Sequence, residues 1–380
     1  MKDWDMGGIN KMRCENVVRS MSARVLLALL GMLSVYEACH AERNYYHPLA
    51  PPAPPASPQP LIPIPVPGGI PSLKPIQKPA GAIVLDSSLC GQADADAGFQ
   101  VALNQAAGKA LWIPPGCVVN LSQPNGISSN TTLACGMGGG VHNMSPLRCA
   151  GAPDVIYGNN DTNVTIEGCT MTGTYDPVNA AADHAWMAAN GCPNWIYNGG
   201  DVATFNGGSN IIFTDNAVTN LFAQEGLFLG GVNGATISKN AFANNFQNGI
   251  QFSSCHNCNV TGNYAVDTNI DIEDAGPHPP GLSTGVWSDN TFVCVNGSGL
   301  QHGASPSCGP QGGDCILVAG NACTNGPGQT CYANEYSGII FENNVFTGPG
   351  MNLVNGQNSG IVYSNHTYTN GANFCPLGFQ

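Results

Sequence analysis

The chain has 380 residues and a mass of 39.3 kDa, and only 9% of its residues are charged. It carries 49 glycines and a formal net charge of −13. From residue 81 onward the only basic residues are Lys109, Arg148 and Lys239, against nineteen Asp and Glu. Nucleic acids and anionic membrane surfaces are bound by clustered Lys and Arg, so neither is expected as a partner. Surface helices draw on Lys, Glu and Arg, so this composition also excludes an ordinary helical enzyme.

Residues 1–41 are predicted to be a signal peptide. Arg19 and Arg24 precede the apolar run VLLALLGMLSV, and small residues ending at Ala41 supply a cleavage site. The run is too short to span a bilayer, which takes about 20 apolar residues. We therefore expect a secreted, periplasmic or cell-surface protein that does not insert into a membrane after the signal is removed.

Residues 42–80 are predicted to be a proline-rich linker, since stretches such as HPLAPPAPPASPQP adopt extended polyproline conformations without a core. The folded domain is predicted to occupy residues 81–380. A short helix is expected at its start, over residues 96–107, because Phe99, Leu103 and Ala106 recur at helical spacing. A strand follows at residues 111–113, and we expect the helix to cap one end of the fold.

Sixteen cysteines are present, of which Cys14 and Cys39 fall in the predicted signal peptide. The other fourteen are even in number, as expected for disulfides in an oxidising compartment. The CHNC segment beginning at Cys255 has half of the spacing of a zinc site. No second such pair is present in the sequence, so a disulfide role is favoured over zinc.

The sequence repeats itself after Asp154, and one Asn recurs at intervals near 23 residues. The predicted members of this series are Asn216, Asn240, Asn263, Asn290, Asn321, Asn344 and Asn365. Each unit contains short β-rich runs separated by Gly and Asn, with no segment long enough for a crossover helix. This pattern predicts the coils of a parallel β-helix. Because coils stack about 4.8 Å apart, successive Asn side chains are expected to hydrogen-bond into a structural ladder.

The opening segment DADAGFQVALNQAAGKALWIPPG and the Asn-bearing repeats resemble the pectin-lyase-like superfamily of parallel β-helices. The resemblance covers residues 81–380 and implies an all-β fold, a single-stranded right-handed parallel β-helix with a short N-terminal capping helix. It also implies a polysaccharide partner. Subfamily motifs are missing: DTNIDI has Thr268 where a polygalacturonase carries its first catalytic Asp, and GGDCI has only Asp314 in place of an Asp pair. The reaction is therefore not assigned by the resemblance.

Three adjacent repeats, EGLFLGG, NGIQFSS and NIDIEDA, align as equivalent strands. Alternate residues of a strand point to opposite faces. One set is therefore predicted to point into the core: Leu227, Leu229, Ile250, Phe252, Ile270 and Ile272. The other set is predicted to form an exposed outward face: Phe228, Gln251 and Asp271 in one column, and Gly230, Ser253 and Glu273 in the next. Thr204 and Asn206 would extend these two columns into the preceding repeat.

The acidic residues of this face are the candidate catalytic site. Asp271 and Glu273 lie two apart on one strand face, about 6–7 Å between attachment points, which suits the carboxylate pair of a glycosidase. Asp274, directly before the inserted segment AGPHPPG, and His278, within it, are expected to assist or orient the pair. Phe228, Gln251 and Ser253, together with Trp186 from an earlier insertion, are the candidate substrate-binding residues.

The leading prediction is an exported, monomeric enzyme that cleaves a polysaccharide by hydrolysis, with no cofactor assigned. One alternative is a non-catalytic surface or glycan-binding protein. A third is a lyase in which carboxylates of this face bind Ca²⁺. Elimination from an acidic glycan needs a cation to neutralise the uronate carboxylate, and this domain has only three basic residues.

Overall fold

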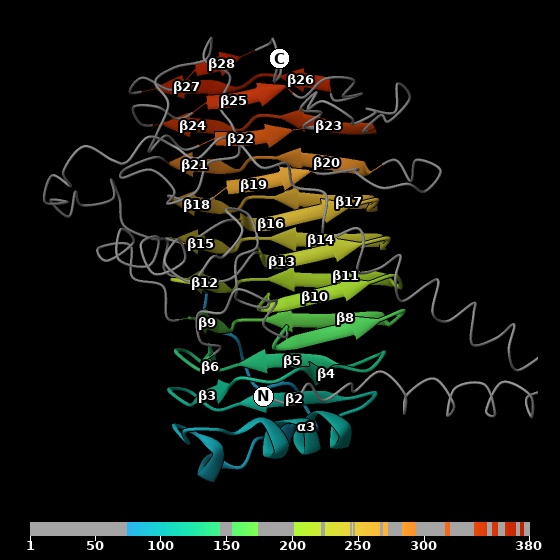
Figure 1. Cartoon of the computed structure of the whole chain (residues 1–380), viewed down its shortest axis with the longest axis vertical. Coiled ribbons are helices and arrows are strands. Elements are labelled where there is room, and N and C mark those ends of the chain that lie inside the picture. The colour runs from blue at the N-terminus through green and yellow to red at the C-terminus, as the bar shows by residue number, and fades with distance from the viewer. Residues whose placement is uncertain are drawn as a thin grey trace, which may run out of the picture. The chain divides into compact units, whose positions relative to one another are not determined.

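The computed structural model describes residues 74–144, 154–173, 201–221, 225–243, 245, 248–266, 269–272, 283–293, 316–319, 338–347, 352–355, 362–369 and 373–375. Their strands form three sheets, here called A, B and C, in which neighbouring strands run parallel. Successive coils of the chain lie on top of one another from the N-terminal to the C-terminal end (Figure 1).

Sheet A has ten strands. They are β1 Ile83–Val84, β2 Ala110–Ile113, β5 Thr132–Cys135, β8 Thr162–Glu167, β11 Ser209–Thr214, β14 Asn233–Ser238, β17 His256–Thr261, β20 Thr284–Ser288, β23 Gly338–Glu342 and β26 Val362–Ser364.

Sheet B has nine strands. They are β3 Val118–Leu121, β6 Gly140–Asn143, β9 Thr170–Thr172, β12 Ala217–Thr219, β15 Ala241–Ala243, β18 Tyr264–Val266, β21 Thr291–Val293, β24 Val345–Thr347 and β27 Thr367–Thr369.

Sheet C also has nine strands. They are β4 Asn125–Gly126, β7 Ile156–Asn159, β10 Ala203–Asn206, β13 Glu225–Gly230, β16 Asn248–Ser253, β19 Asn269–Ile272, β22 Ile316–Ala319, β25 Asn352–Asn355 and β28 Asn373–Cys375.

The order of the strands in the three sheets defines the fold. The chain passes from A to B to C and back to A, so that β8, β9 and β10 make one coil and β11, β12 and β13 make the next. Every strand therefore pairs with its equivalents one coil before and one coil after. This is the single-stranded parallel β-helix that the sequence predicts, and the predicted fold class is confirmed.

Inward-pointing side chains fill the interior of the solenoid. Leu227 and Leu229 of β13, and Ile250 and Phe252 of β16, are fully buried, as the repeat alignment predicts. Aromatic rings pack between coils: the ring centroids of Phe252 and Trp287 lie 5.2 Å apart, edge to face.

The asparagine ladder lies at the corner between sheets A and B. The backbone N–H and Nδ2 of Asn240 both donate to Oδ1 of Asn263, at 3.0 and 2.9 Å. Nδ2 of Asn240 also donates to the carbonyl of Phe213 in the preceding coil, at 2.9 Å. These side chains are buried, so each bond satisfies a polar group that water cannot reach.

Two predicted members of the ladder are wrong. Asn321 lies outside the described residues, but Asn290 donates directly to Oδ1 of Asn344, so the ladder has no member between these two. The segment before Asn321 forms β22 in sheet C, not a strand of sheet A. At the C-terminal end the ladder position is His366, because Val345 pairs with Thr367, and Asn365 lies one residue earlier at a corner with φ of 54°.

Helix α3, Asp96–Gln105, confirms the predicted N-terminal helix and ends two residues earlier than expected. It buries Phe99 and Leu103 at the N-terminal end of the core. The carboxylate of Asp96 accepts hydrogen bonds from the backbone N–H and the hydroxyl of Ser122 and from Nδ2 of Asn125. Burial acts to raise the pKa of Asp96, but these bonds outweigh it and lower that pKa. A charged carboxylate thus ties the helix to the loop that closes the first coil.

Three disulfides join described cysteines: Cys90–Cys117, Cys135–Cys169 and Cys255–Cys258. The CHNC segment therefore forms a disulfide, as its context favours, and not half of a zinc site. No helix among the described residues has the length and hydrophobicity needed to cross a membrane. The predicted signal peptide lies outside the described residues, and its boundary at residue 41 stays a prediction.

The C-terminal part of the predicted linker, residues 74–80, lies among the described residues. The side chain of Ile76 is half-buried, and its Cβ and Cγ1 lie against Gly168 at the end of β8. A Cβ on Gly168 would collide with this side chain and with the carbonyl of Cys135, and Gly168 has φ of 69°. Glycine at this corner therefore makes room for the segment that precedes β1.

Candidate functional site

The strands of sheet C pair in the register that the repeat alignment predicts. Thr204 pairs with Phe228, Phe228 with Gln251, and Gln251 with Asp271. The pairing continues toward the N-terminus, where Tyr157 precedes Thr204 and Gly126 precedes Tyr157. These residues form one column on the outer face of sheet C, called the outer column below. Its members recur about every 4.8 Å.

Several predicted site residues are only partly covered by the structure. For Asp271 and Ser253 the backbone is described within β19 and β16, but not the side chain. Glu273, Asp274, His278 and Trp186 lie outside the described residues. The roles proposed for all of them stay predictions.

The outer face of sheet C is less exposed than the alternating pattern predicts. Thr204 is 0% exposed and Gln251 is 3% exposed, although both point away from the core. The hydroxyl of Thr204 donates to Oδ2 of Asp201, itself buried, at 2.8 Å, so this polar pair is satisfied without water. The prediction of an exposed face is therefore wrong at Thr204 and Gln251, because alternation decides only which side of the strand a residue occupies.

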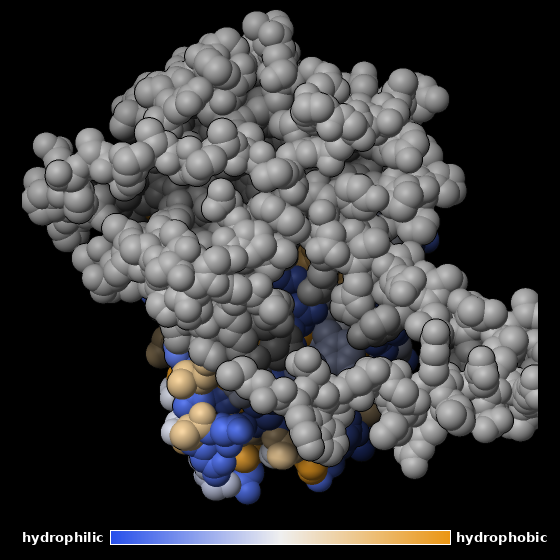
Figure 2. Space-filling model, in the orientation of Figure 1, coloured by the Kyte–Doolittle hydropathy of each residue, from blue (hydrophilic) through white to orange (hydrophobic). Residues whose placement is uncertain are grey.

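The accessible part of the face lies toward its N-terminal end. Tyr157 is 41% exposed, Asn159 and Asn206 are exposed, and Phe228 is half-buried. The space-filling view shows a mixture of hydrophilic and hydrophobic residues on the described surface at this end (Figure 2). Sequence reasoning missed Tyr157 and Asn159. Their segment, VIYGNN, carries the same alternation as the repeat that follows, and aligning it with VATFNG would have found both.

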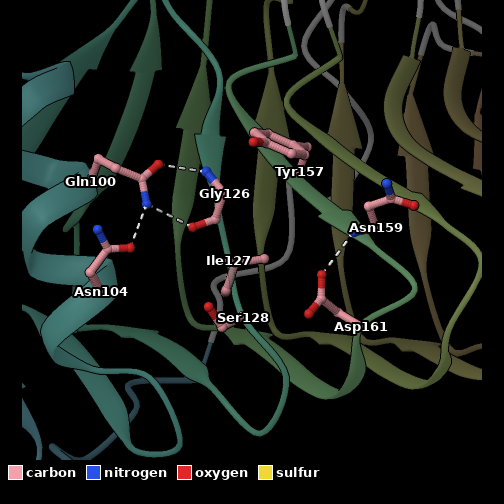
Figure 3. A pocket seen from close by; sticks show the side chains of 8 residues that line it. All are labelled: Gln100, Asn104, Gly126, Ile127, Ser128, Tyr157, Asn159 and Asp161. Carbon is pink, nitrogen blue, oxygen red and sulfur yellow. Dashed lines mark hydrogen bonds between the residues drawn. The ribbon is translucent and has the colours of Figure 1, made fainter. Parts of the chain in front are cut away.

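A pocket of about 320 Å³ opens at the N-terminal end of this face (Figure 3). Pockets of this size fall at the lower end of the range for small-molecule sites. The described residues that line it come from α3, β4, β7 and the turns that follow these two strands: Gln100, Asn104, Gly126, Ile127, Ser128, Tyr157, Asn159 and Asp161. Figure 3 shows the two α3 side chains on one side of the pocket and Asn159 and Asp161 on the other.

On the α3 side of the pocket, the side-chain amide of Gln100 forms with β4 the hydrogen bonds that a neighbouring strand would form. Oε1 of Gln100 accepts from the N–H of Gly126 at 2.7 Å, and its Nε2 donates to the carbonyl of Gly126 at 3.0 Å. The same Nε2 donates to Oδ1 of Asn104 at 3.0 Å. Because β4 is the edge strand of sheet C, Gln100 satisfies backbone groups that would otherwise be unpaired.

The opposite side of the pocket is fixed by the carboxylate of Asp161. Its Oδ2 accepts from the N–H of Asn159 at 2.8 Å, and its Oδ1 accepts from the hydroxyl of Ser129 at 3.0 Å. Asn160, between them, has φ of 57°, a conformation that Asn tolerates better than most residues. The carboxylate therefore holds a tight turn and presents a negatively charged acceptor beside the pocket.

Glycines make room for the two aromatic rings of the outer column. A Cβ on Gly126 would lie 3.3 Å from the hydroxyl oxygen of Tyr157, and one on Gly230 would lie 2.9 Å from Cε1 of Phe228. Tyr157 thus lies over Gly126 of the preceding coil, and Phe228 lies beside Gly230 of its own strand. Aromatic rings on a polar face are suited to stacking on the apolar faces of ligand rings.

The described lining of the pocket carries negative charge only. Its described lining contains one carboxylate and no Lys, Arg or His. No group of three or more described His, Cys, Asp or Glu side chains is arranged to hold a metal ion. The polar side chains of the described lining carry amides, two hydroxyls and a carboxylate, which form hydrogen bonds with neutral polar ligands.

No protein-family model matches the sequence, and no curated protein matches it. Several solved structures do. Polygalacturonase from Erwinia carotovora ssp. carotovora matches with a TM-score of 0.46 and 12% identity, over 81% of this chain and 98% of that one. The catalytic domain of Agl-KA matches with a TM-score of 0.43 and 13% identity, over 82% and 70%. PfbA, a surface adhesin of Streptococcus pneumoniae, matches with a TM-score of 0.33 and 11% identity, over 77% and 93%.

These likenesses are too distant to support any statement about activity, and they name both a hydrolase and an adhesin. The pairing of the strands within the molecule is sufficient for the fold. By that pairing, the chain is a three-sheet parallel β-helix of the kind that its sequence resembles.

Proposed function

We propose that this protein is a carbohydrate-active β-helix protein that binds a polysaccharide along the outer face of sheet C. The observation that carries the proposal is the outer column, in which Tyr157 is 41% exposed and Phe228, two coils further along, is half-buried. Exposed amides of Asn159 and Asn206 stand in the adjacent column. Rings that stack on sugars, flanked by amides that bond to hydroxyls, suit a chain of repeating sugar units.

Export to an oxidising compartment is part of the proposal. The Cys90–Cys117 and Cys135–Cys169 disulfides support it, because such bonds persist outside the reducing cytosol. A secreted, periplasmic or cell-surface protein would also meet polysaccharides directly.

Binding is tested by measuring the affinity of the wild type for a panel of neutral and acidic polysaccharides, by affinity electrophoresis and calorimetry. Tyr157→Ala and Phe228→Ala should each weaken binding about tenfold, as expected for the loss of a stacked aromatic ring. Met137→Ala is the control, because Met137 is 72% exposed in the turn between β5 and β6 and does not belong to sheet C. Unchanged affinity in both aromatic variants would exclude this face as the binding site.

Hydrolysis is the second function that we propose for the same face. The register supports it by putting Asp271 in the outer column next to Gln251, one coil beyond it. With Glu273 two residues further along the chain, the two carboxylates would act as general acid and as base or nucleophile. Asp274 and His278 would orient them.

Catalysis is tested by the release of reducing ends from the polysaccharides that bind. Asp271→Asn and Glu273→Gln should each lower the rate at least about a hundredfold while leaving affinity nearly unchanged. Binding without release of reducing ends in the wild type would favour the non-catalytic, glycan-binding alternative. A rise in ultraviolet absorbance from an unsaturated product, abolished by a chelator, would favour the Ca²⁺-dependent lyase instead.

A further inference from the structure

We propose that the pocket between α3 and β7 is a subsite for the terminal sugar of a neutral polysaccharide chain. This inference rests on the proposed function, because it concerns the end of the same face. None of its lining residues belongs to the site that the sequence predicts, whose members in sheet C lie two to four coils beyond β7.

The position of the pocket explains why it would take a chain end. Gly126 and Tyr157, the first two members of the outer column, both line the pocket. Among the described residues no strand of sheet C lies beyond Gly126, because β4 is at the edge of that sheet. The side chain of Gln100 occupies the edge of β4 through its two bonds to Gly126. A sugar chain that follows the outer column therefore meets α3 and stops there.

The lining explains why the sugar would be neutral. Asn104, Ser128 and Asn159 offer amide and hydroxyl groups that bond to sugar hydroxyls, and the ring of Tyr157 is half-exposed for stacking. Asp161 is the only charged group among the described lining residues. A uronic acid in this pocket would bring its carboxylate close to Asp161, and no cation among the described lining residues would offset the repulsion. A neutral hexose or pentose meets no such repulsion, and its hydroxyls donate to the carboxylate.

The closing experiment uses the full chain and defined oligosaccharides. The neutral probes are linear malto-, cello-, laminari- and xylo-oligosaccharides, and the acidic probe is an oligogalacturonate of matched length, tested with and without Ca²⁺. Affinities are measured by calorimetry, and saturation-transfer NMR shows which sugar of the bound oligosaccharide lies closest to the protein. We expect at least one neutral oligosaccharide to bind about tenfold or more tightly than the oligogalacturonate. We also expect one terminal sugar to receive the strongest saturation.

Two substitutions remove pocket groups and leave both hydrogen bonds of Gln100 to Gly126 in place. Tyr157→Ala and Asn104→Ala should each weaken binding of the neutral oligosaccharide about tenfold and abolish the preference for saturation of the terminal sugar. Val101→Ala is the matched control, because Val101 lies on the same helix, is 54% exposed and does not line the pocket.

The outcomes separate this inference from the function on which it rests. If Phe228→Ala weakens binding while Tyr157→Ala and Asn104→Ala do not, the polysaccharide binds the face but not the pocket, and the inference fails alone. Oligogalacturonate binding as tightly as the neutral probes, with or without Ca²⁺, would overturn the neutral class. Strongest saturation of internal sugars would overturn the terminal subsite. If no probe binds, or Phe228→Ala and Tyr157→Ala both bind as the wild type does, the proposed function fails as well.

Discussion

The backbone N–H of Asn344 donates a hydrogen bond to Nδ1 of His366 at 3.2 Å, where an asparagine oxygen is the acceptor in the preceding coils. Nδ1 is therefore the nitrogen without a proton. Asn290 donates to Oδ1 of Asn344 through both its backbone N–H and its Nδ2. Asn344 directs its own Nδ2 only to the carbonyl of Trp287. The ladder thus loses one side-chain bond where histidine replaces asparagine.

Replacing His366 by asparagine should extend the ladder. The new Oδ1 would accept from both the backbone and Nδ2 of Asn344, and we expect the free energy of unfolding to rise by about 0.5–1 kcal/mol. His366→Ala should lower it by about 1–3 kcal/mol, since the buried N–H of Asn344 would lose its acceptor. Urea unfolding measures both. Asn365→Gly is the control: a corner residue with positive φ tolerates glycine, so little change is expected there. A large fall in the free energy of unfolding for Asn365→Gly would show instead that Asn365 belongs to the ladder.

Asp215 and Glu167 are carboxylates in adjacent coils at the end of sheet A. Burial raises the pKa of Glu167, and the negative charge of Asp215 raises it further. Asp215→Asn should remove that repulsion, while Asn keeps the positive φ of 54° and still accepts from the hydroxyl of Thr214. Both groups are partly exposed to solvent, so we expect a gain below about 1 kcal/mol at neutral pH. This gain in unfolding free energy should shrink as the pH falls below the raised pKa of Glu167, because the protonated Glu167 no longer repels Asp215.

The matched control for this prediction is Asp215→Asn in a Glu167→Gln background, where the second carboxylate is absent. Thermal unfolding at neutral and at acid pH should show a gain for Asp215→Asn in the wild-type background alone. An equal gain in both backgrounds would assign the effect to the corner and not to Glu167.

His142 should make the free energy of unfolding fall as the pH is lowered below neutrality. Its Nδ1 lies 2.8 Å from the hydroxyl of Thr172 in the next coil, and burial lowers its pKa below the ordinary 6.5. The unfolded chain then binds a proton more readily than the folded one. The contribution of His142 is present above pH 6.5 and is lost as the pH falls through 6.5 toward the lowered pKa. Because the ring is only half-buried, we expect this loss to stay below about 1 kcal/mol.

Unfolding free energies measured between about pH 7 and pH 5 test this sign. His142→Gln should flatten the decline that the wild type shows over that interval, because glutamine does not titrate. A decline that is equally steep in the variant would assign the pH dependence to other groups.

Two of the three described disulfides should differ in how much they raise the free energy of unfolding. Cys135–Cys169 closes a loop with a sequence separation of 34, whereas Cys255–Cys258 closes one of only 3. In the chain-entropy account the longer loop restricts the unfolded state more, about 4 kcal/mol against about 2 kcal/mol. Paired Cys→Ala substitutions at each bridge compare the two by urea unfolding. Both pairs are buried, so cavity costs are similar in the two variants. Equal losses, or a larger loss at Cys255–Cys258, would contradict the entropic explanation.

Much of the fold could be predicted from the sequence because the residue patterns that specify it are local. Alternation of apolar and polar residues indicated which side of β13 and β16 faces the core, and the same repeat units aligned Phe228, Gln251 and Asp271 in their true register. Helix α3 followed from the spacing of Phe99 and Leu103. The prediction of which residues form the ladder was wrong at Asn321 and Asn365. A residue type recurring at a near-regular interval does not reveal which sheet a strand joins, or a shift of one residue at a corner.

The accessible site was decided by tertiary structure. Alternation placed Thr204 and Gln251 on the outer side of their strands, but it does not determine how far each side chain is exposed there, and both are buried. The pocket exists because α3, which precedes the first coil in the sequence, lies beside β4, and residues of β7 line the same pocket. There Gln100 pairs with Gly126, and Tyr157 lies over that same glycine. By itself, then, the sequence determined the solenoid, its capping helix and the strand register, since these follow from periodicity within each repeat. Which part of the face is open, and where it ends, depends on contacts between residues far apart in the chain, and only the folded structure brings those residues together.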